Sequence, residues 1–304
     1  MATSRSQIAA TTVAFGADAG IATAKFFGFL VSGRSAMRAE SLHSVADTIN
    51  QLLLIIGKRQ ARRQPDRLHQ FGYGRSRYFY SFVVAMITFA MGSVFALYEG
   101  YRKLTNPKPL TAPWVAIVIV VVAALLEGYS LRNARMESKP LRDSYSWWHF
   151  IRNSRTPELP VVLLEDSAAL IGLSLAFAGV GLTILTGAPV WDAIGTLGIG
   201  ALLGGCAVVL IIETHSLLIG EGATREQYTT IRSVLEATEG VLRIVDMRTQ
   251  YLAPDELLVV AKVVFGRQPE LAAAAHAIAI AEKQVRSAVP AVRMICLQPN
   301  VENV

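Results

Sequence analysis

Six apolar stretches constrain the fold of this chain more than any other feature of its sequence. They cover residues 8–31, 36–58, 78–101, 113–132, 159–185 and 191–218. Each is close to the roughly 20 residues that a helix needs to cross a bilayer. Of the 304 residues, 52% are hydrophobic and only 17% are charged, against about 25% charged in ordinary soluble domains. The sequence therefore predicts a membrane protein with six transmembrane α-helices.

The C-terminal residues have the pattern of a small soluble domain. We expect a helix, two strands, a second helix and a third strand at 224–238, 245–251, 257–265, 270–288 and 292–297. The first strand alternates apolar Val245, Met247 and Tyr251 with polar residues, as a half-buried strand does. The order α-β-β-α-β predicts a cytoplasmic α+β domain, ferredoxin-like, with both helices over one face of the sheet. We place a six-helix transmembrane domain at 1–219 and this domain at 220–304.

Basic residues gather in alternate connections between the apolar stretches. The connection at 59–77 carries six arginines, whereas the one at 186–190 carries no basic residue. Because Lys and Arg are retained on the cytoplasmic side, the pattern predicts a multi-pass protein of a cell's inner membrane with both termini in the cytoplasm. This topology accounts for the net charge of +6. No interleaving of aromatic and basic residues indicates a nucleic-acid partner.

His43 and Asp47 lie four residues apart inside the second apolar stretch. An α-helix has about 3.6 residues per turn, so both project from one face. An imidazole and a carboxylate stacked in this way make half of a tetrahedral metal site. Ionisable groups are costly in hydrocarbon and usually mark a transport path or a partner. The alternative is a packed, hydrogen-bonded His beside an Asp that caps the helix or faces water.

The fifth apolar stretch offers further metal ligands. Asp166 supplies a third ligand if the second and fifth stretches pack together, whereas Val162, one turn earlier, cannot coordinate a metal. Glu165 flanks this stripe and is a candidate fourth ligand. Its alternative is to face the cytoplasm near the helix start, where the helix dipole favours negative charge. Glu40, three residues before His43, and water are the other candidates for the fourth position.

Other chemistry has little support in the sequence. Cys206 and Cys296 have no CxxC partner, so neither a disulfide framework nor a cysteine metal site is expected. No HExxH or GxSxG motif occurs, and we therefore do not predict an enzyme. We expect no prosthetic group.

The His and Asp motifs resemble those of the cation diffusion facilitators, in particular the branch that contains the mitochondrial zinc transporter of animals. The resemblance covers essentially the whole chain. Its most specific strings are AESLHSVADTINQ at 39–51 and LLEDSAALIG at 163–172, with further matches at 71–75 and 98–107.

This resemblance implies a homodimer whose protomers export divalent cations, zinc first, from the cytoplasm in exchange for protons by alternating access. It assigns His43 and Asp47 to the ligand pair of the second span, and Asp166 to the second position of the fifth-span pair. The domain at 220–304 is implied to dimerise. Val162 stands where most members have His or Asp, so Mn²⁺, Fe²⁺ or Co²⁺ in place of zinc is one alternative. A non-transporting metal sensor or interaction protein with a degraded site is another.

The resemblance also bears on two secondary metal sites. Asp66 and His69 match positions that bind a second ion in some members, but Tyr73 replaces the accompanying histidine; the alternative is a solvated loop. His276 is the only histidine of the tail. We therefore expect the regulatory zinc sites of some members' tails to be missing here.

Overall fold

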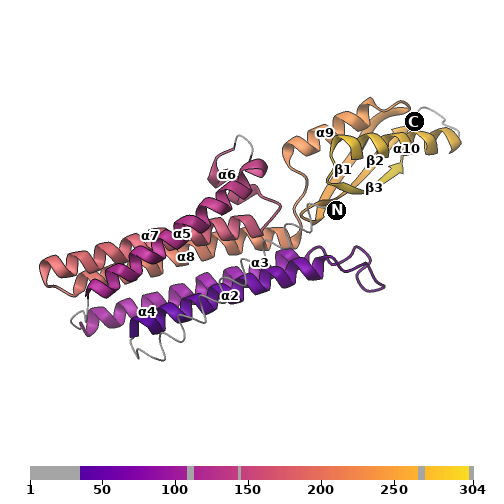
Figure 1. Ribbon diagram of the computed structural model, residues 1–304. Coiled ribbons are helices and arrows are strands. Elements are labelled where there is room, and N and C mark those ends of the chain that lie inside the picture. The colour runs from indigo at the N-terminus through magenta and orange to yellow at the C-terminus, as the bar shows by residue number, and fades with distance from the viewer. Residues whose placement is uncertain (1–34, 108–112, 143–144, 266–270, 301–304) are drawn as a thin grey trace. The chain divides into compact units, whose positions relative to one another are not determined.

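The computed structural model describes residues 35–107, 113–142, 145–265 and 271–300 (Figure 1). The first apolar stretch, 8–31, lies outside them. The chain divides into two compact units, each of which we describe by itself. One holds the residues up to Arg59 together with Phe79–Thr214, and the other holds Gln60–Tyr78 together with His215–Val304.

The first unit is built from helices, most of them long, which Figure 1 shows from the side. They are α2 (Ser35–Ala61), the continuous run of α3 (Ser76–Val84), the π-helix η1 (Ala85–Met91) and α4 (Gly92–Thr105), then α5 (Pro113–Arg142), α6 (Trp147–Asn153), α7 (Glu158–Thr186) and α8 (Val190–Ile219). Among the described residues, three segments are long and apolar enough to cross a membrane, at 76–105, 158–186 and 190–219. Helices α2 and α5 occupy the second and fourth expected spans.

Three features of these helices differ from the expectation. Helix α5 runs ten residues past the expected end at 132, because the following segment is rich in strong helix formers such as Ala, Arg, Met, Glu and Lys. The short helix α6 was not expected. It begins where the Ser146 Oγ accepts a hydrogen bond of 3.2 Å from the backbone N–H of His149, which caps its first turn. The π-helix η1 divides the third span.

Helices α4 and α8 approach each other closely through glycines. A Cβ added to Gly200 would lie 2.7 Å from Cγ of Leu97, and one added to Gly100 would lie 2.8 Å from Cγ of Leu197. The buried Ser93 Oγ donates a hydrogen bond of 2.7 Å to the carbonyl oxygen of Gly200. Small residues that let backbones approach, with a hydroxyl bond across the interface, are typical of helix pairs in membranes.

The second unit contains a three-stranded sheet covered by two helices. Its elements are α9 (Arg225–Ala237), β1 (Val241–Ala253), β2 (Glu256–Phe265), α10 (Leu271–Ala288) and β3 (Val292–Pro299), which follow the expected order α-β-β-α-β. The strands lie in the order β1-β2-β3. Strand β2 pairs antiparallel with β1 and parallel with β3, because α10 carries the chain back across the sheet.

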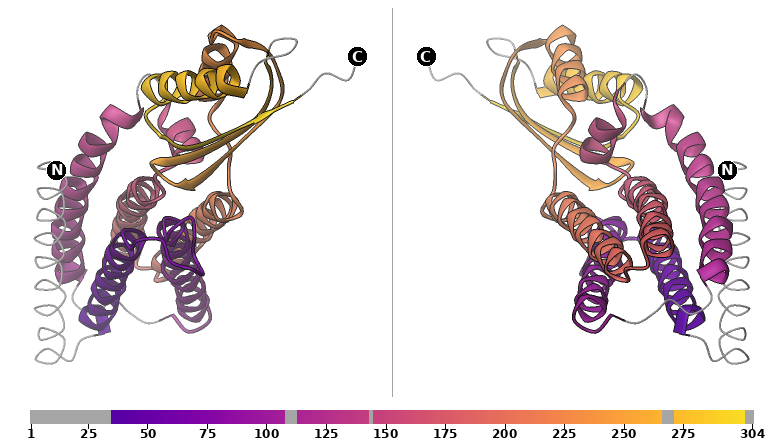
Figure 2. Two further views of the ribbon diagram at one scale, coloured as in Figure 1. Left: turned by 90° about the vertical axis from the view of Figure 1, so that its right-hand side faces the viewer. Right: turned by 90° about the vertical axis from the view of Figure 1, so that its left-hand side faces the viewer.

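One face of the sheet forms the hydrophobic core of this unit. On β2 the alternate residues Leu257, Val259 and Val263 are buried and pack with Ile231 of α9 and Val285 of α10. Figures 1 and 2 show both helices on this face. The opposite face is open among the described residues and exposes apolar side chains, including those of Val260 on β2 and Met294 on β3.

The loop before α3 belongs to the second unit and contacts the β1–β2 hairpin. A Cβ at Gly74 would overlap the Cβ of Ala253, so glycine is required for the close approach. The Arg77 Nη1 lies 3.4 Å from the Asp255 Oδ1. The packing of this loop therefore depends on a backbone contact and one ion pair.

Candidate metal site

Two neighbouring carboxylates near the start of α7 form the described part of the candidate site. Helix α7 begins after Pro157, and Glu165 and Asp166 follow about two turns later in a segment that is otherwise apolar. Asp166 is buried, with 6% of its surface exposed, and Glu165 is half-buried. A buried ionised carboxylate needs hydrogen bonds or a counter-charge, so the partners of each carboxylate decide what the site can do.

Glu165 reaches α2. The Asn50 Nδ2 donates a hydrogen bond of 3.1 Å to its Oε1, and the Asn50 side chain is only 2% exposed. Asn50 follows His43 by seven residues and Asp47 by three, so by helical periodicity all three positions share one side of α2. Position 47 is three residues from Asn50, which is less than one helical turn of about 3.6 residues and 5.4 Å. It therefore lies close to the hydrogen bond between Asn50 and Glu165.

Asp166 is held from a third helix. The Ser130 Oγ of α5 donates a hydrogen bond of 2.9 Å to its Oδ2. Val162, one turn earlier on α7, packs with Leu131 of α5 and Phe150 of α6. The valine, whose side chain cannot coordinate a metal, thus takes part in an apolar contact.

The predicted residues are placed by the structure to different degrees. Glu165 and Asp166 are adjacent, and each has a polar partner on another helix. The backbone of α2 carries Glu40, His43 and Asp47, but their side chains lie outside the described part of the structure. Among the side chains that are described, no three His, Cys, Asp or Glu residues group closely enough to hold a metal ion. The four-ligand set therefore stays a prediction.

The loop pair Asp66 and His69 is organised by internal hydrogen bonds. The Asp66 Oδ1 accepts from the backbone N–H groups of Leu68 and His69, at 2.9 and 2.7 Å, and its Oδ2 accepts from the Tyr73 hydroxyl. The Tyr73 hydroxyl and then the His69 amide lower the pKa of Asp66 from 3.8 to about 2. The carboxylate thus closes an Asx-type turn, with the Tyr73 hydroxyl as one of its hydrogen-bond donors.

Two polar residues of this site were not predicted. Asn50 could have been recognised as a polar residue at position i+3 from Asp47 in an apolar run. Ser130 gave no such signal, because a single serine near the end of an apolar stretch is common and its partner is 36 positions away.

Long apolar helices that carry a pair of carboxylates within their apolar length are typical of a protein embedded in a membrane. Residues 11–219 match the model of the cation efflux transmembrane domain, and the chain therefore belongs to the cation efflux family. It is a cation diffusion facilitator similar to the mitochondrial zinc transporter of animals.

Three relatives support this placement. The chain is 33% identical over 243 residues to "Proton-coupled zinc antiporter SLC30A9, mitochondrial" of Xenopus laevis, covering 79% of this chain and 44% of that protein. It is 32% identical over 249 residues to the Homo sapiens protein of the same name, covering 79% and 43%. It is 31% identical over 252 residues to "Metal tolerance protein C4" of Arabidopsis thaliana, covering 80% and 54%. The chain spans less than half the length of these animal relatives.

Proposed function

We propose that this protein exports divalent metal cations from the cytoplasm across a membrane in exchange for protons, and that zinc is its principal substrate. Membership of the cation efflux family and the names of the animal relatives, proton-coupled zinc antiporters, support the proposal. The observation that carries it is the hydrogen bond from Asn50 to Glu165. This bond brings the acidic turn of α7 against the side of α2 that bears positions 43 and 47.

We assign the metal to His43, Asp47, Asp166 and Glu165. The first two share a face of α2 by their spacing, and the last two project from one turn of α7. The contact of Glu165 with α2 supports it as the fourth ligand in place of Val162. One imidazole with carboxylate oxygens at a tetrahedral site suits Zn²⁺.

Proton coupling follows from the chemistry of these ligands. Each must be deprotonated to bind a metal, so protons and metal compete for the same atoms. The unperturbed imidazole pKa of about 6.5 lies close to cytoplasmic pH. A lower pH on the side opposite the cytoplasm would protonate the ligands and release the metal. The protein would then carry the proton to the cytoplasm when it returns to its inward-facing state.

We propose a homodimer of protomers that each have six spans, with both termini in the cytoplasm. The basic connections at 59–77 and 133–158 support this orientation. Residues 220–304 would form the dimerisation domain, and the exposed apolar Val260 and Met294 on the open face of the sheet support an interface there. Because His276 is the only histidine of this domain, dimerisation should not require zinc. We place the protein in a cell's inner membrane.

Preference for a harder cation is the second candidate function. Three carboxylates and one imidazole form an oxygen-rich set, and oxygen ligands suit Mn²⁺ or Fe²⁺ better than a set rich in imidazole or thiolate does. The position of Glu165 against α2 is the observation that favours this alternative.

Metal-driven proton flux in proteoliposomes tests these proposals. The full chain is reconstituted with a pH-sensitive dye inside, and Zn²⁺, Mn²⁺, Fe²⁺, Co²⁺ and Cd²⁺ are supplied in turn. We expect zinc to drive the largest flux, and Asp47→Ala and Asp166→Ala to abolish it. Glu137→Gln, an exposed position of α5, serves as the control and should transport normally.

Each outcome of this assay separates the candidates. A larger flux with Mn²⁺ or Fe²⁺ than with zinc would support the second candidate. Metal binding without any flux in the wild type would identify a sensor or interaction protein. Flux that persists in Asp47→Ala would contradict the assigned site.

A further inference from the structure

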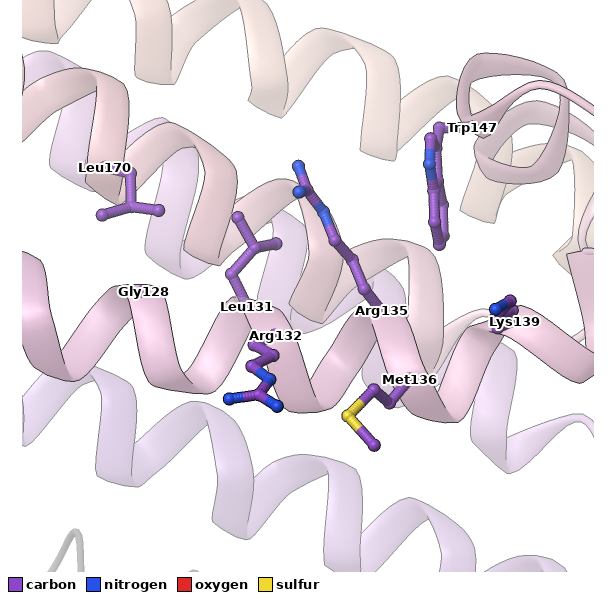
Figure 3. A pocket seen from close by; sticks show the side chains of 8 residues that line it. All are labelled: Gly128, Leu131, Arg132, Arg135, Met136, Lys139, Trp147 and Leu170. Atoms are coloured by element: carbon purple, nitrogen blue, oxygen red, sulfur yellow. The ribbon is translucent and has the colours of Figure 1, made fainter.

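The C-terminal half of α5, whose end lies in the cytoplasm in the proposed topology, lines a cavity that includes none of the proposed metal ligands. It has a volume of about 390 Å³ and is lined by α5 residues together with Trp147 of α6 and Leu170 of α7. Figure 3 shows its lining side chains. We call this cavity the basic groove, because three of its lining residues are Arg132, Arg135 and Lys139.

The three cations of the basic groove lie on one stretch of helix surface. Their spacing of three and four residues distributes them over about 10 Å of the length of α5. All three are exposed. Figure 3 shows Arg132 and Arg135 extending to either side of α5, with Lys139 further along the helix. Three positively charged side chains thus line the groove, two of them extending in different directions.

These cations have no carboxylate partner within the described residues, whereas some other basic residues of the chain do. Arg102 pairs with Glu99 at 2.9 Å, and Arg152 pairs with Glu213 at 2.9 Å. No ion pair of this kind joins Arg132, Arg135 or Lys139 to the described acidic residues, although Glu137 is on the same helix. An external anion would therefore meet cations that no nearby acid neutralises.

The walls of the groove are apolar, which argues against a small soluble anion as the ligand. Leu131, Met136, Trp147 and Leu170 line it beside the cations. The Trp147 ring is held by the Arg142 guanidinium, which lies 4.6 Å from its centroid. Tryptophan is enriched where membrane proteins cross the headgroup region.

An exposed apolar strip on α5 leads directly into the groove. Val118, Leu125 and Tyr129 are 61, 70 and 68% exposed, and positions 125, 129, 132 and 136 follow one another along one face at helical spacing. The exposed face of α5 is therefore apolar within the expected span of residues 113–132 and basic from the end of that span onward. A ligand that fits it has an anionic head and an apolar tail.

We propose that the basic groove binds an anionic phospholipid. Its phosphate would contact Arg132, Arg135 and Lys139, since guanidinium groups bind phosphate oxygens in bidentate fashion. Its acyl chains would lie along the strip at Val118, Leu125 and Tyr129. Basic pockets between helices on the cytoplasmic side are suited to anionic headgroups. None of the proposed metal ligands is among the residues that line the groove.

Lipid retention by the purified full chain tests this proposal. The protein is equilibrated in nanodiscs of phosphatidylcholine with a minor fraction of phosphatidylglycerol, and the lipids that remain bound after detergent extraction are counted by mass spectrometry. The variant Arg132→Gln/Arg135→Gln/Lys139→Gln should lose at least roughly tenfold in phosphatidylglycerol retention, because each basic residue near an anionic headgroup attracts it. The control Arg59→Gln/Arg62→Gln/Arg67→Gln removes the same charge from another basic segment and should retain the lipid.

A second pair of variants tests the shape of the groove without any change of charge. Gly128 lines the groove, and a Cβ added there meets no atom within 4 Å, so Gly128→Leu should fold normally and obstruct lipid binding. Gly181 on α7 is equally open, and Gly181→Leu is the matched control. Monodisperse elution and thermal unfolding confirm the fold of each variant.

Three results would overturn the proposal. Equal loss of lipid in both triple variants would indicate general charge attraction to the membrane. Competition by inorganic phosphate as effective as that by phosphatidylglycerol would identify a site for a soluble anion. Unchanged lipid retention in Gly128→Leu would place the lipid elsewhere.

Discussion

The Asn50 amide of α2 and the Glu165 carboxylate of α7 are joined by a hydrogen bond of 3.1 Å, although they lie 115 positions apart in the sequence. The amide neutralises no charge, so it orients the carboxylate while leaving its negative charge available. A neutral donor of this kind positions a metal ligand without competing with the cation for it. This arrangement makes Asn50 a positioning residue for the proposed site.

Replacing Asn50 with alanine should weaken metal binding without removing a ligand. A hydrogen bond to a charged group contributes about 1.5–3 kcal/mol, so Asn50→Ala should raise the zinc concentration for half-maximal flux by roughly tenfold or more. The maximal flux should change less. Ile49→Ala, at an exposed neighbouring position, is the control. An unchanged zinc dependence in Asn50→Ala would contradict a positioning role.

Ser130 supports Asp166 in the same way from α5. Ser130→Ala removes a donor to a buried carboxylate, and leaving such a group less satisfied costs about 1–3 kcal/mol. Zinc-driven flux at low zinc should fall by about tenfold. Ser138 is the matched control, because it lies on the same helix, is fully buried, and has an Oγ without a hydrogen-bond partner. Equal effects of Ser138→Ala and Ser130→Ala would point to packing rather than to support of Asp166.

The close packing of α4 on α8 predicts a stability effect. An alanine at Gly200 would place a Cβ 2.9 Å from the backbone nitrogen of Leu97, which cannot move as a flexible side chain can. Overpacking of this kind costs about 1–3 kcal/mol, so Gly200→Ala should lower the thermal unfolding temperature in detergent by several degrees. A Cβ at Gly205 meets no atom within 4 Å, and Gly205→Ala should leave the temperature unchanged or raise it.

The Asp66 turn predicts a defined pH dependence. Because the pKa of Asp66 is lowered from 3.8 to about 2, its stabilising hydrogen bonds are fully present above pH 3.8 and are lost as the pH falls through about 2. Hydrogen–deuterium exchange of the segment 62–75, corrected for intrinsic rates, should therefore be equally slow at pH 7 and pH 4. Tyr73→Phe removes the largest cause of the shift and should accelerate exchange at pH 4. Slower exchange on addition of zinc would instead reveal a metal site in this loop.

Two variants should separate backbone packing from charge at the β1–β2 hairpin. The ion pair between Arg77 and Asp255 involves an aspartate that is 77% exposed, and such surface pairs contribute about 0–1 kcal/mol. Asp255→Ala should therefore be nearly neutral. Gly74→Leu would force a side chain into Ala253 and should accelerate hydrogen exchange in the hairpin at 249–257. A larger effect of Asp255→Ala than of Gly74→Leu would mean that the ion pair dominates this contact.

The pattern of apolar residues in the sequence predicted the helices and strands that bury an apolar surface. The expected fifth and sixth spans, 159–185 and 191–218, end within one residue of α7 and α8, because apolar length alone sets the limits of such helices. The order of elements in the C-terminal unit was also predicted, since alternation and turn residues are local signals. Helix α6 and the extension of α5 to Arg142 were missed, because a capped turn and a polar helix lack any apolar period.

The candidate site was only partly predictable for a different reason. Glu165 and Asp166 stand out as charges in an apolar segment, so their importance is visible in the sequence. Which helix holds each carboxylate depends on how α7 is rotated in the bundle, and no pattern along one helix specifies that rotation. Asn50 has a signal in the sequence as a polar residue in an apolar run, whereas the role of Ser130 became visible only once its partner on α7 was known.

The π-helix at Ala85–Met91 divides the third span into two α-helical segments, α3 and α4. The side chains of α4 therefore need not continue the helical periodicity of α3. Each residue of an α-helix turns the chain by about 100°, so one residue inserted or deleted in an uninterrupted span would rotate its entire far half away from its contacts. A segment with i→i+5 bonding already accommodates a wider turn. It can take up such a change while Val84 on one side and Gly100 on the other keep their neighbours. We therefore expect this segment to accommodate a one-residue insertion or deletion while the span keeps its packing against α8.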